Sequence, residues 1–449
     1  MILSSFVRRA TMGAVLTAAG VAAPPIAAAQ GTTPRVSAAE RAAARAVDSH
    51  NAEALALLVR LVNINSGTMN LAGVRSVADV LRPQLEALGF KTRWVDGASF
   101  KRAGHLVAEH PGTGPKILLI GHLDTVFEPS SPFQKFIKLN DSTATGPGVI
   151  DMKGGDVVML FALRALKDAG QLERMNVTAV FDGDEEDAGR PLSASRKALK
   201  DAAVGASAAM GFEDGAGDPK SAVISRRSAT EWKITTTGYP GHASQIFHSD
   251  IGAGAIFEMS RILTEFQQKL SGEPYLAFSP GLALGGTLVN LDSTNTAGSA
   301  SGKTNVIAGK MTVTGDMRTL SPEQLAKTEK AMREIVSHHL PKTGGEITFE
   351  DGYPPMAPTD GNRRLLAMYD QASRDLGTGT VVAVDPSKAG AADVAFIANT
   401  VPMVIDGIGL SGHDDHSAKE TADLRMLPSQ TKRAAVVMLR LSQMKSVTP

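Results

Sequence analysis

The sequence predicts an α/β fold in which helices flank a mostly parallel sheet, with a smaller α+β domain inserted into it. Short apolar runs bounded by Gly or Pro alternate with helical patterns up to about residue 222. Beyond that point the pattern becomes strand, helix, two strands, helix, strand, which is the split βαβ arrangement. The length of 449 residues also exceeds what one ordinary core accommodates, so two domains are expected.

The composition is that of an ordinary globular enzyme. Apolar residues make up 43% of the chain and the formal net charge is zero, so there is no overall basic field to attract nucleic acid. Cysteine is absent. Without disulfides or thiolate ligands, any bound metal must be held by histidine and carboxylate side chains.

The first 29 residues have the pattern of a secretory signal peptide. Arg8 and Arg9 precede an apolar, alanine-rich stretch that ends at Ala29, where we expect cleavage and export to the periplasm or medium. The paired arginines also allow twin-arginine export. Pro24 and Pro25 interrupt the stretch, which is shorter than the roughly 20 apolar residues that span a bilayer. We therefore favour a removed signal over a membrane anchor, and expect no membrane association afterwards.

Residues 37–222 are predicted to form the first part of the main domain. Ser37 and Glu40 have capping-box spacing before an alanine-rich helix. In a parallel sheet of this kind, ligands collect at the carboxyl ends of the strands. Further helices are predicted at about 74–88 and 159–166, and strands at 92–95, 105–108, 117–120 and 177–181.

The inserted domain is predicted at residues 223–351. Ser321, Pro322 and Gln324 provide a helix cap, a first-position proline and a capping-box partner. The other elements expected there are strands at 231–237, 286–291, 311–317 and 346–350 and a helix at 251–270. The main domain then resumes over residues 352–449 with a helix at 365–376 and strands at 381–384 and 403–405.

The first motif with chemical potential follows the predicted strand at 117–120. His122 and Asp124 are two residues apart in the turn that leaves this strand. Such spacing lets the imidazole bind a metal while the carboxylate orients it. The same residues could equally form a plain turn with an Asx hydrogen bond.

The second motif is a glycine-rich segment, 146–155, that contains Asp151. This aspartate lies just before a predicted helix, where its carboxylate could bridge two cations. Its simpler alternative role is that of a helix N-cap.

The third motif is an acidic run directly after the predicted strand at 177–181. Residues 182–187 include five carboxylates, which repel one another at close range unless cations or solvent relieve them. The adjacent Glu185 and Glu186 could divide the work, with one ligating a metal and the other accepting a proton from water. A solvated acidic loop is the alternative.

Together the three motifs resemble the M20 family of metallopeptidases, especially its glutamate carboxypeptidase-like and aminoacylase-like members. The resemblance covers nearly the whole chain after the signal and implies a zinc-exopeptidase fold with a ferredoxin-like lid and dimerisation domain. It implies that His122 binds one zinc ion, Asp151 bridges both and Glu186 binds the other. A water held between the ions would attack the amide carbonyl, with Glu185 as general base and Asp124 supporting His122.

Two further ligands follow from the resemblance. Glu213, after Gly211 and Phe212, matches the next ligand segment, although Asp214 stands where the family often has proline and is an alternative. His416 begins a His-Ser-x-x-Glu pattern that resembles the last ligand motif, and His413 is its less favoured rival. The family implies two zinc ions per subunit; cobalt or manganese would suit the same ligand types.

The inserted domain carries a segment, 238–244, that resembles the family's lid. Its histidine, His242, would help hold the oxyanion, often by reaching across a homodimer formed through this domain, and His248 is the alternative. Asn305 and Arg318 match lid positions that contact substrate in relatives, although Arg318 is equally well read as an ordinary strand-end charge. Gly390 opens a segment that resembles a glycine-rich loop lining the substrate pocket.

One departure limits the expected substrate. Tyr353 stands before proline where glutamate-releasing members carry an arginine for the substrate carboxylate, and tyrosine cannot replace its bidentate fork. We therefore do not expect a preference for C-terminal glutamate. The resemblance implies a carboxypeptidase or N-acyl-amino-acid hydrolase acting on a small peptide or N-acyl amino acid. The alternatives are an aminopeptidase or dipeptidase on the same scaffold and, less favoured, a binding protein that has lost catalysis.

Overall fold

The computed structural model describes residues 36–444. The predicted signal peptide, residues 1–29 with Arg8 and Arg9, lies outside the described residues. None of the helices in the described range is both long and apolar enough to cross a membrane.

The main domain has the predicted α/β class and is built on a six-stranded mixed sheet. Three of its five pairings are parallel, namely β6 with β3, β3 with β7 and β7 with β16, and the two pairings of β2 are antiparallel. The alanine-rich β7 was not expected as a strand because alanine has low β propensity. In sheet order the strands are β1 (Lys91–Asp96), β2 (Gly104–His110), β6 (Asn176–Asp182), β3 (Lys116–His122), β7 (Ala206–Gly211) and β16 (Val404–Ile405).

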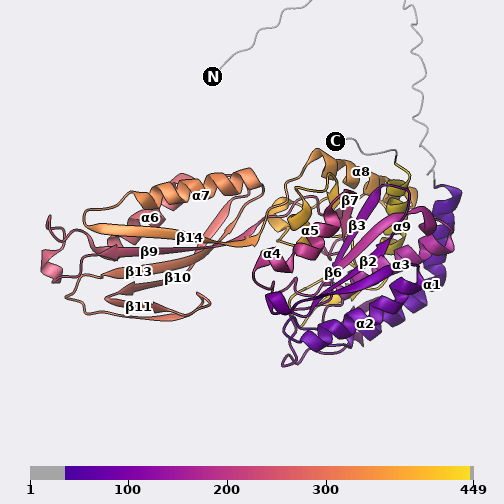
Figure 1. Cartoon of the computed structure of the whole chain (residues 1–449), viewed down its shortest axis with the longest axis horizontal. Coiled ribbons are helices and arrows are strands. Elements are labelled where there is room, and N and C mark those ends of the chain that lie inside the picture. The colour runs from indigo at the N-terminus through magenta and orange to yellow at the C-terminus, as the bar shows by residue number, and fades with distance from the viewer. Residues whose placement is uncertain (1–35, 445–449) are drawn as a thin grey trace, which may run out of the picture. The chain divides into compact units, whose positions relative to one another are not determined.

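Helices cover both faces of this sheet (Figure 1). Side chains of β3 alternate between the two cores: Ile117 and Leu119 face one, Leu118 and Ile120 the other. The helices of the larger core are α1 (Ala38–Val62), α2 (Leu71–Ala87), α3 (Lys153–Asp168), α8 (Asp360–Asp375) and α9 (Met426–Ser442). The smaller core is covered by α5 (Lys197–Ala203), which follows the short α4 (Leu192–Ser195), and by the 3-10 helix η5 (Asp393–Ile397).

The first helix begins where the capping box predicts. The Ser37 hydroxyl accepts a hydrogen bond from the Glu40 backbone at 3.2 Å, and the Glu40 carboxylate accepts one from the Ser37 backbone at 2.5 Å. This reciprocal pair satisfies two of the amide groups that a helix start leaves without partners.

A small antiparallel sheet brings distant segments to the same side of the main domain. Its central pairing joins β5 to β18 and places the segment before Asp151 beside the segment that contains His416. The strands, in order, are β17 (Gly412–His413), β18 (Thr421–Asp423), β5 (Thr143–Thr145) and β4 (Ile137–Lys138). A short parallel pair is formed by β15 (Val382–Ala383) and β8 (Ser221–Ala222).

The inserted part has the expected order of strand, helix, two strands, helix and strand. Its antiparallel sheet runs β10-β13-β9-β14, and both helices pack on one face of it (Figure 1). Trp232, Ile234, Phe266 and Met332 are among the side chains that fill the core between sheet and helices. The elements are β9 (Ala229–Gly238), α6 (Gly254–Leu270), β10 (Ala277–Gly286), β13 (Lys310–Arg318), α7 (Pro322–Ser337) and β14 (Thr343–Tyr353).

The second strand of this sheet is not the one that was predicted. The strand at 286–291 was expected in the sheet, but β11 (Leu288–Leu291) pairs with β12 (Gly298–Ser301) in a separate hairpin. The sheet instead uses β10, which contains Pro280 and Gly281 and therefore reads poorly as a strand. It tolerates them because it lies at the sheet edge and shifts register between Pro280 and Leu282.

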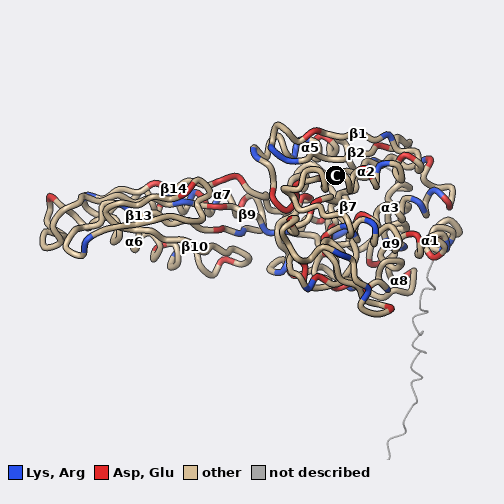
Figure 2. The backbone as a smooth tube through the Cα atoms, turned by 90° about the horizontal axis from the view of Figure 1, so that it is seen from below, with Lys and Arg blue, Asp and Glu red and all other residues tan. Residues whose placement is uncertain are grey.

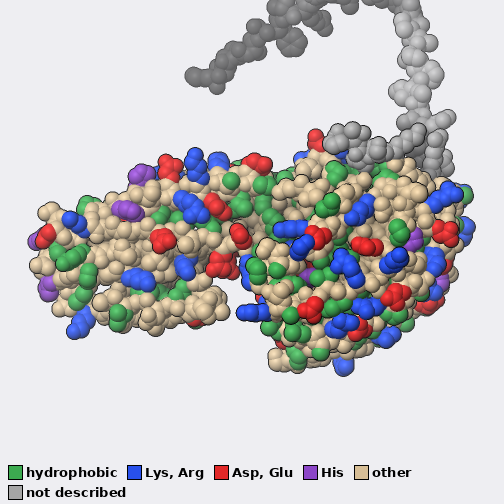
Figure 3. Space-filling model, viewed as in Figure 1, with side chains coloured by type: hydrophobic (Ala, Val, Ile, Leu, Met, Phe, Trp, Pro, Cys, Tyr) green, Lys and Arg blue, Asp and Glu red, His purple; other side chains and the backbone are tan. Residues whose placement is uncertain are grey.

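Charged residues are distributed along the whole described chain. Acidic and basic positions are interspersed along the backbone of both the main and the inserted part (Figure 2). The face shown in Figure 3 likewise carries side chains of both signs. This distribution agrees with the formal net charge of zero.

Candidate metal centre and active site

Neighbouring strand ends bring the predicted metal ligands together. β6, β3 and β7 are adjacent and parallel, so the loops that follow them meet at one edge of the sheet. His122 is the last residue of β3, Glu186 follows β6 and Glu213 follows β7. Asp151 precedes α3, and His416 lies between β17 and β18.

Asp151 lies between the two histidines and presents one carboxylate oxygen to each. Its Oδ1 is 3.1 Å from the Nε2 of His122, and its Oδ2 is 2.9 Å from the Nε2 of His416. A carboxylate that bridges two cations needs its two oxygens directed toward two separate ligand sets. The arrangement around Asp151 meets this requirement.

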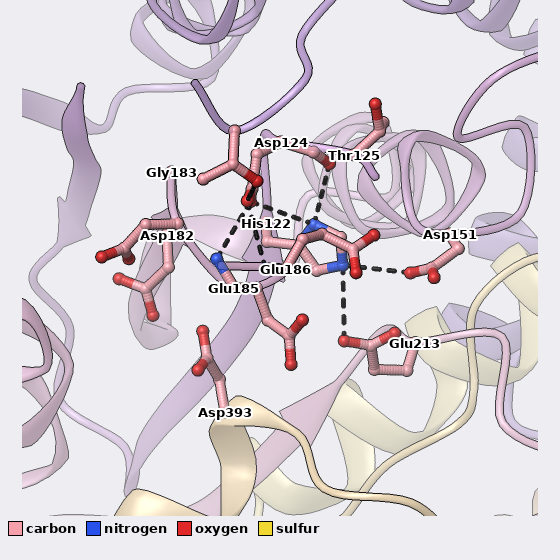
Figure 4. A network of polar contacts seen from close by, with 12 residues as sticks. His122, Asp124, Thr125, Asp151, Asp182, Gly183, Glu185, Glu186, Glu213 and Asp393 are labelled. Carbon is pink, nitrogen blue, oxygen red and sulfur yellow. Dashed lines mark hydrogen bonds and ion pairs between the residues drawn. The ribbon is translucent and has the colours of Figure 1, made fainter. Parts of the chain in front are cut away.

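Each histidine also has a glutamate of its own. Glu213 Oε1 is 3.5 Å from His122 Nε2, and Glu186 Oε2 is 3.1 Å from His416 Nε2. Figure 4 shows Asp151 and Glu213 both directed at the same nitrogen of His122. The ligand atoms of His122, Asp151 and Glu186 lie within 4.8 Å of one another, so donors from both halves of the site lie close together.

The surroundings of these carboxyl groups favour a bound cation. Glu186 Oε1 is buried and has no hydrogen-bond partner. Burial, with Asp151 nearby, raises the pKa of both Glu186 and Glu213 well above the usual range. Crowded, buried oxygen and nitrogen donors with an unpartnered carboxylate oxygen fit divalent metal ions of the kind that imidazole and carboxylate bind.

The histidines change the pKa of Asp151 in the opposite direction. Burial would raise the pKa of Asp151, but hydrogen bonds to His122 and His416 outweigh it and lower that pKa below its usual range. The hydrogen bonds to Asp151 and Glu186 raise the pKa of His416 to about 11.

Glu185 lies beside the candidate ligands on the side of His122. Within residues 36–444 its side chain makes no hydrogen bond or ion pair with His416. Its carboxylate lies within 4.8 Å of the ligand atoms of His122 and Glu213. Burial, together with Asp151 and Asp124, raises the pKa of Glu185 to about 7. A carboxyl group with a pKa near neutrality is suited to accept and return a proton.

Asp124 connects His122 to the two glutamates. Its backbone oxygen is 3.1 Å from His122 Nδ1. Its fully buried carboxylate accepts hydrogen bonds from the backbone amides of Glu185 and Glu186, both at 3.1 Å, and from the Thr68 hydroxyl at 2.6 Å. Asp124 therefore orients both the imidazole and the loop that carries the glutamates. Thr68 carried no signal in the sequence.

The geometry also distinguishes the alternatives that the sequence left open. His413 is exposed and lies 2.9 Å from its neighbour Asp414, whereas His416 contacts Asp151. Asp214 belongs to none of the described groups whose ligand atoms lie within 4.8 Å of one another, whereas Glu213 does. Asp415, which no motif singled out, forms such a group with Asp151 and His416.

Glu420 is a further residue whose role the sequence did not show, although it ends the motif of His416. Its buried carboxylate accepts backbone hydrogen bonds from Gly148 and Ile150, both at 2.9 Å, and from Asp151 at 3.2 Å. It thus holds the turn that presents Asp151. Burial raises the pKa of Glu420 to about 7.

The predicted lid residues lie apart from this cluster. His242 and Asn305 are neighbours, because the Ala243 amide donates to the Asn305 carbonyl at 2.9 Å and residue 242 forms a β-bridge with residue 306. Both side chains are exposed. Within residues 36–444, no hydrogen bond or ion pair joins His242, Asn305 or Arg318 to the residues around Asp151.

The other two predicted substrate contacts have local partners. Arg318 ends β13 and pairs with Asp316 at 2.7 Å, as an ordinary strand-end charge would. Gly390 is exposed, and its carbonyl accepts a hydrogen bond at 3.0 Å from Arg226, a buried arginine that also pairs with Asp406.

Similar proteins support the family resemblance. Carboxypeptidase G2 of Pseudomonas sp. (strain RS-16) is 26% identical over 392 residues, which cover 86% of this chain and 88% of that protein. Human aminoacylase-1 is 26% identical over 288 residues, which cover 59% of this chain and 66% of that protein.

Solved structures share the fold. Aminopeptidase PepT of Bacillus cereus matches with a TM-score of 0.68 and 17% identity, over 88% of this chain and 99% of that chain. The YXEP protein of Bacillus subtilis, described as a dinuclear metal-binding peptidase of the M20 family, matches with a TM-score of 0.61 and 16% identity, over 88% of this chain and 99% of that chain.

The family model itself spans most of the chain. Residues 118–442 match peptidase family M20/M25/M40, a range that includes all five candidate metal ligands and Glu185. The chain therefore belongs to peptidase family M20/M25/M40 and is a hydrolase of the peptidase or amidohydrolase type.

Proposed function

We propose that this protein is a two-zinc hydrolase that cleaves an amide bond at the end of a small substrate, as a carboxypeptidase or an N-acyl-amino-acid hydrolase. The observation that carries the proposal is the position of Asp151, with one oxygen toward His122 and the other toward His416. One zinc would be held by His122, Glu213 and Asp151, and the second by His416, Glu186 and Asp151.

Three protein ligands on each ion leave coordination positions open for substrate and water. Two divalent cations bound there would lower the pKa of a water molecule and polarise the scissile carbonyl. Zinc is our first choice, and cobalt or manganese would suit the same ligands.

Glu185 moves the proton in this mechanism. Its carboxylate, which lies within 4.8 Å of the ligand atoms of His122 and Glu213, would accept a proton from water at this site. The protonated Glu185 then donates to the leaving nitrogen. That second transfer is needed because an unprotonated amide nitrogen is a poor leaving group. Asp124 keeps the base in place through the 3.1 Å hydrogen bond from the Glu185 amide.

His242 would complete the site by stabilising the oxyanion. Because it does not contact the metal cluster within the described residues, we propose that it approaches when the inserted domain closes or from a second subunit of a homodimer. Asn305, beside it, would contact the substrate. Arg318 is a weaker candidate, because Asp316 already pairs with it.

The substrate class is proposed from the relatives. Tyr353, which stands where glutamate-releasing members carry an arginine, gives no support for a preference for C-terminal glutamate. Similarity to carboxypeptidase G2 and to aminoacylase-1 favours a small peptide or an N-acyl amino acid. Aminopeptidase PepT of Bacillus cereus and a yeast dipeptidase share the fold, so an aminopeptidase or dipeptidase is the second candidate. Because residues 1–29 resemble a signal peptide, we propose that the enzyme acts in the periplasm or outside the cell.

A release assay tests this proposal. Purified protein, stripped with a chelator and then supplied with zinc, is incubated with N-acyl amino acids, N-blocked dipeptides and free dipeptides. Release from the blocked compounds only with zinc supports a carboxypeptidase or deacylase. Cleavage restricted to free dipeptides would favour the second candidate, and no metal-dependent release from any of the three classes would contradict the proposal.

A further inference from the structure

Tyr353 is the last residue of β14, where the chain returns from the inserted domain to the main domain. Its hydroxyl donates a hydrogen bond to the backbone carbonyl of Glu185 at 2.6 Å. The same hydroxyl accepts a hydrogen bond from Arg196 Nη2, also at 2.6 Å. A residue at the end of the inserted domain therefore contacts the backbone of the proposed general base.

Arg196 is fully buried and holds the same loop from its other side. Its Nη1 pairs with Asp184 Oδ1 at 2.6 Å, and its Nη2 donates to the Asp184 carbonyl at 2.9 Å. Its Nε pairs with Asp393 Oδ1 at 2.7 Å. The guanidinium thus fixes the residue immediately before Glu185 and ties it to the segment that follows Gly390.

The buried basic side chains beside this loop have acidic partners. Burial would lower the pKa of His105, but Asp182, 3.0 Å away, outweighs it and raises that pKa. The same contact lowers the pKa of Asp182 to about 2. Burial raises the pKa of Asp393 well above its usual range, although Arg196 pairs with it. Arg196 thus has Asp184 and Asp393 as partners and His105 has Asp182, so each of these buried basic side chains contacts a carboxyl group beside the loop.

The Tyr353 hydroxyl is suited to a lasting structural role. Burial, with Glu185 and Asp393 nearby, raises its pKa well above the usual range, so it remains a neutral donor. A charge-assisted hydrogen bond from a guanidinium orients the hydroxyl, so that its proton points to the Glu185 carbonyl. The aromatic ring packs against Phe396 with centroids 4.8 Å apart, and Arg196 lies over both rings.

We propose that Tyr353 is a positioning residue for Glu185, which it holds through a hydrogen bond to the backbone while Arg196 orients its hydroxyl. This inference rests on the proposed function, in which Glu185 is the general base. It also explains the departure at this position: the tyrosine acts within the protein where glutamate-releasing relatives are expected to bind substrate with arginine. Because β14 ends at Tyr353, the contact links the placement of the base to the inserted domain.

Tyr353→Phe tests the proposal because it keeps the ring and its packing and removes only the hydroxyl. We expect kcat to fall on the order of tenfold, the cost of a slightly misplaced catalytic group, with KM and zinc content within twofold of the wild type. The acidic limb of the pH profile of kcat/KM should shift, because the position of Glu185 changes. The substitution Tyr353→4-aminophenylalanine restores a donor to the Glu185 carbonyl and should recover most of kcat.

Tyr369→Phe is the matched control. Tyr369 is also buried, and its hydroxyl donates to Gln430 at 3.2 Å between α8 and α9. The Tyr369→Phe variant should lose about as much thermal stability as Tyr353→Phe but keep the wild-type kcat and pH profile. A Tyr353→Phe enzyme with wild-type kcat, or one that loses kcat only because it loses zinc, would overturn the positioning role.

A Glu185→Gln variant separates this inference from the function on which it rests. If Glu185→Gln is inactive and Tyr353→Phe is fully active, the positioning role fails and the proposed base stands. If Glu185→Gln retains turnover, the proposed mechanism fails, and the positioning role fails with it.

Discussion

Asp151 Oδ2 lies 2.9 Å from Nε2 of His416, although the two residues are far apart in the sequence. The pairing of β5 with β18 brings their segments together, and Glu420 fixes the turn that carries Asp151. The last of the proposed ligands thus reaches the site through the small antiparallel sheet, whereas His122, Glu186 and Glu213 reach it at the ends of the main-sheet strands.

Removal of His416 should abolish one of the two metal positions. His416→Ala is expected to bind about one zinc per chain and to lose most turnover, because Asp151 and Glu186 alone leave the second ion under-ligated. Inductively coupled plasma mass spectrometry of the desalted protein measures the metal content. His413→Ala is the control, since His413 is exposed and pairs only with Asp414. Two zinc ions per chain in His416→Ala would refute the assignment.

Chelation should abolish activity reversibly. Dialysis against a strong chelator is expected to remove both ions, and added zinc or cobalt to restore turnover in proportion to the metal bound, with saturation near two ions per chain. If the wild-type turnover survives when less than roughly a tenth of a metal ion remains per chain, the reaction does not require the metal ions.

Metal binding should release protons, and the apparent metal affinity should rise with pH. In the metal-free protein, burial keeps the pKa of Glu186 and Glu213 well above the usual range, and that of His416 is raised to about 11. His416 holds a proton at neutral pH that a cation must displace, and the raised pKa of the two glutamates acts in the same direction, so higher pH favours binding. Calorimetric titration with zinc in buffers of different ionisation enthalpy measures the release. Zero net release at pH 6.5 would contradict these protonation states.

Glu420→Gln should weaken the turn that carries Asp151. The amide keeps one acceptor oxygen where the carboxylate offers two, so at least one of the buried amides of Gly148, Ile150 and Asp151 loses its partner. An unsatisfied buried amide costs about 1–3 kcal/mol. The free energy of unfolding in urea should fall by that amount and zinc should bind more weakly. The variant Glu346→Gln serves as control because Glu346 is exposed. A Glu420→Gln protein with wild-type free energy of unfolding and zinc affinity would show that Glu420 does not support the turn.

The sequence predicted those parts of the molecule that have local signatures. Apolar runs shortly before His122 and Glu185 marked two strands, and the capping box of Ser37 marked the start of α1. The strands that were missed lack such signatures: β7 consists mostly of alanine, and β10 contains Pro280 and Gly281, which only an edge position tolerates.

The candidate site shows the same division. His122, Asp151, Glu186, Glu213 and His416 follow strand ends or lie in recognisable motifs. The joint role of Arg196 and Tyr353 has no such signal, because it depends on contacts between segments far apart in the chain. A lone arginine between two short helices and a tyrosine before proline form no pattern that predicts the hydrogen bonds from Arg196 to Tyr353 and from Tyr353 to Glu185.

Turnover by Glu185→Gln, measured together with its metal content, tests the central claim most directly. Glutamine has nearly the same shape but cannot accept the proton from water, and loss of a general base costs roughly 100- to 10,000-fold in rate. The account predicts a fall of that size in kcat with about two zinc ions still bound per chain. A Glu185→Gln enzyme that keeps wild-type kcat with both ions bound would contradict it.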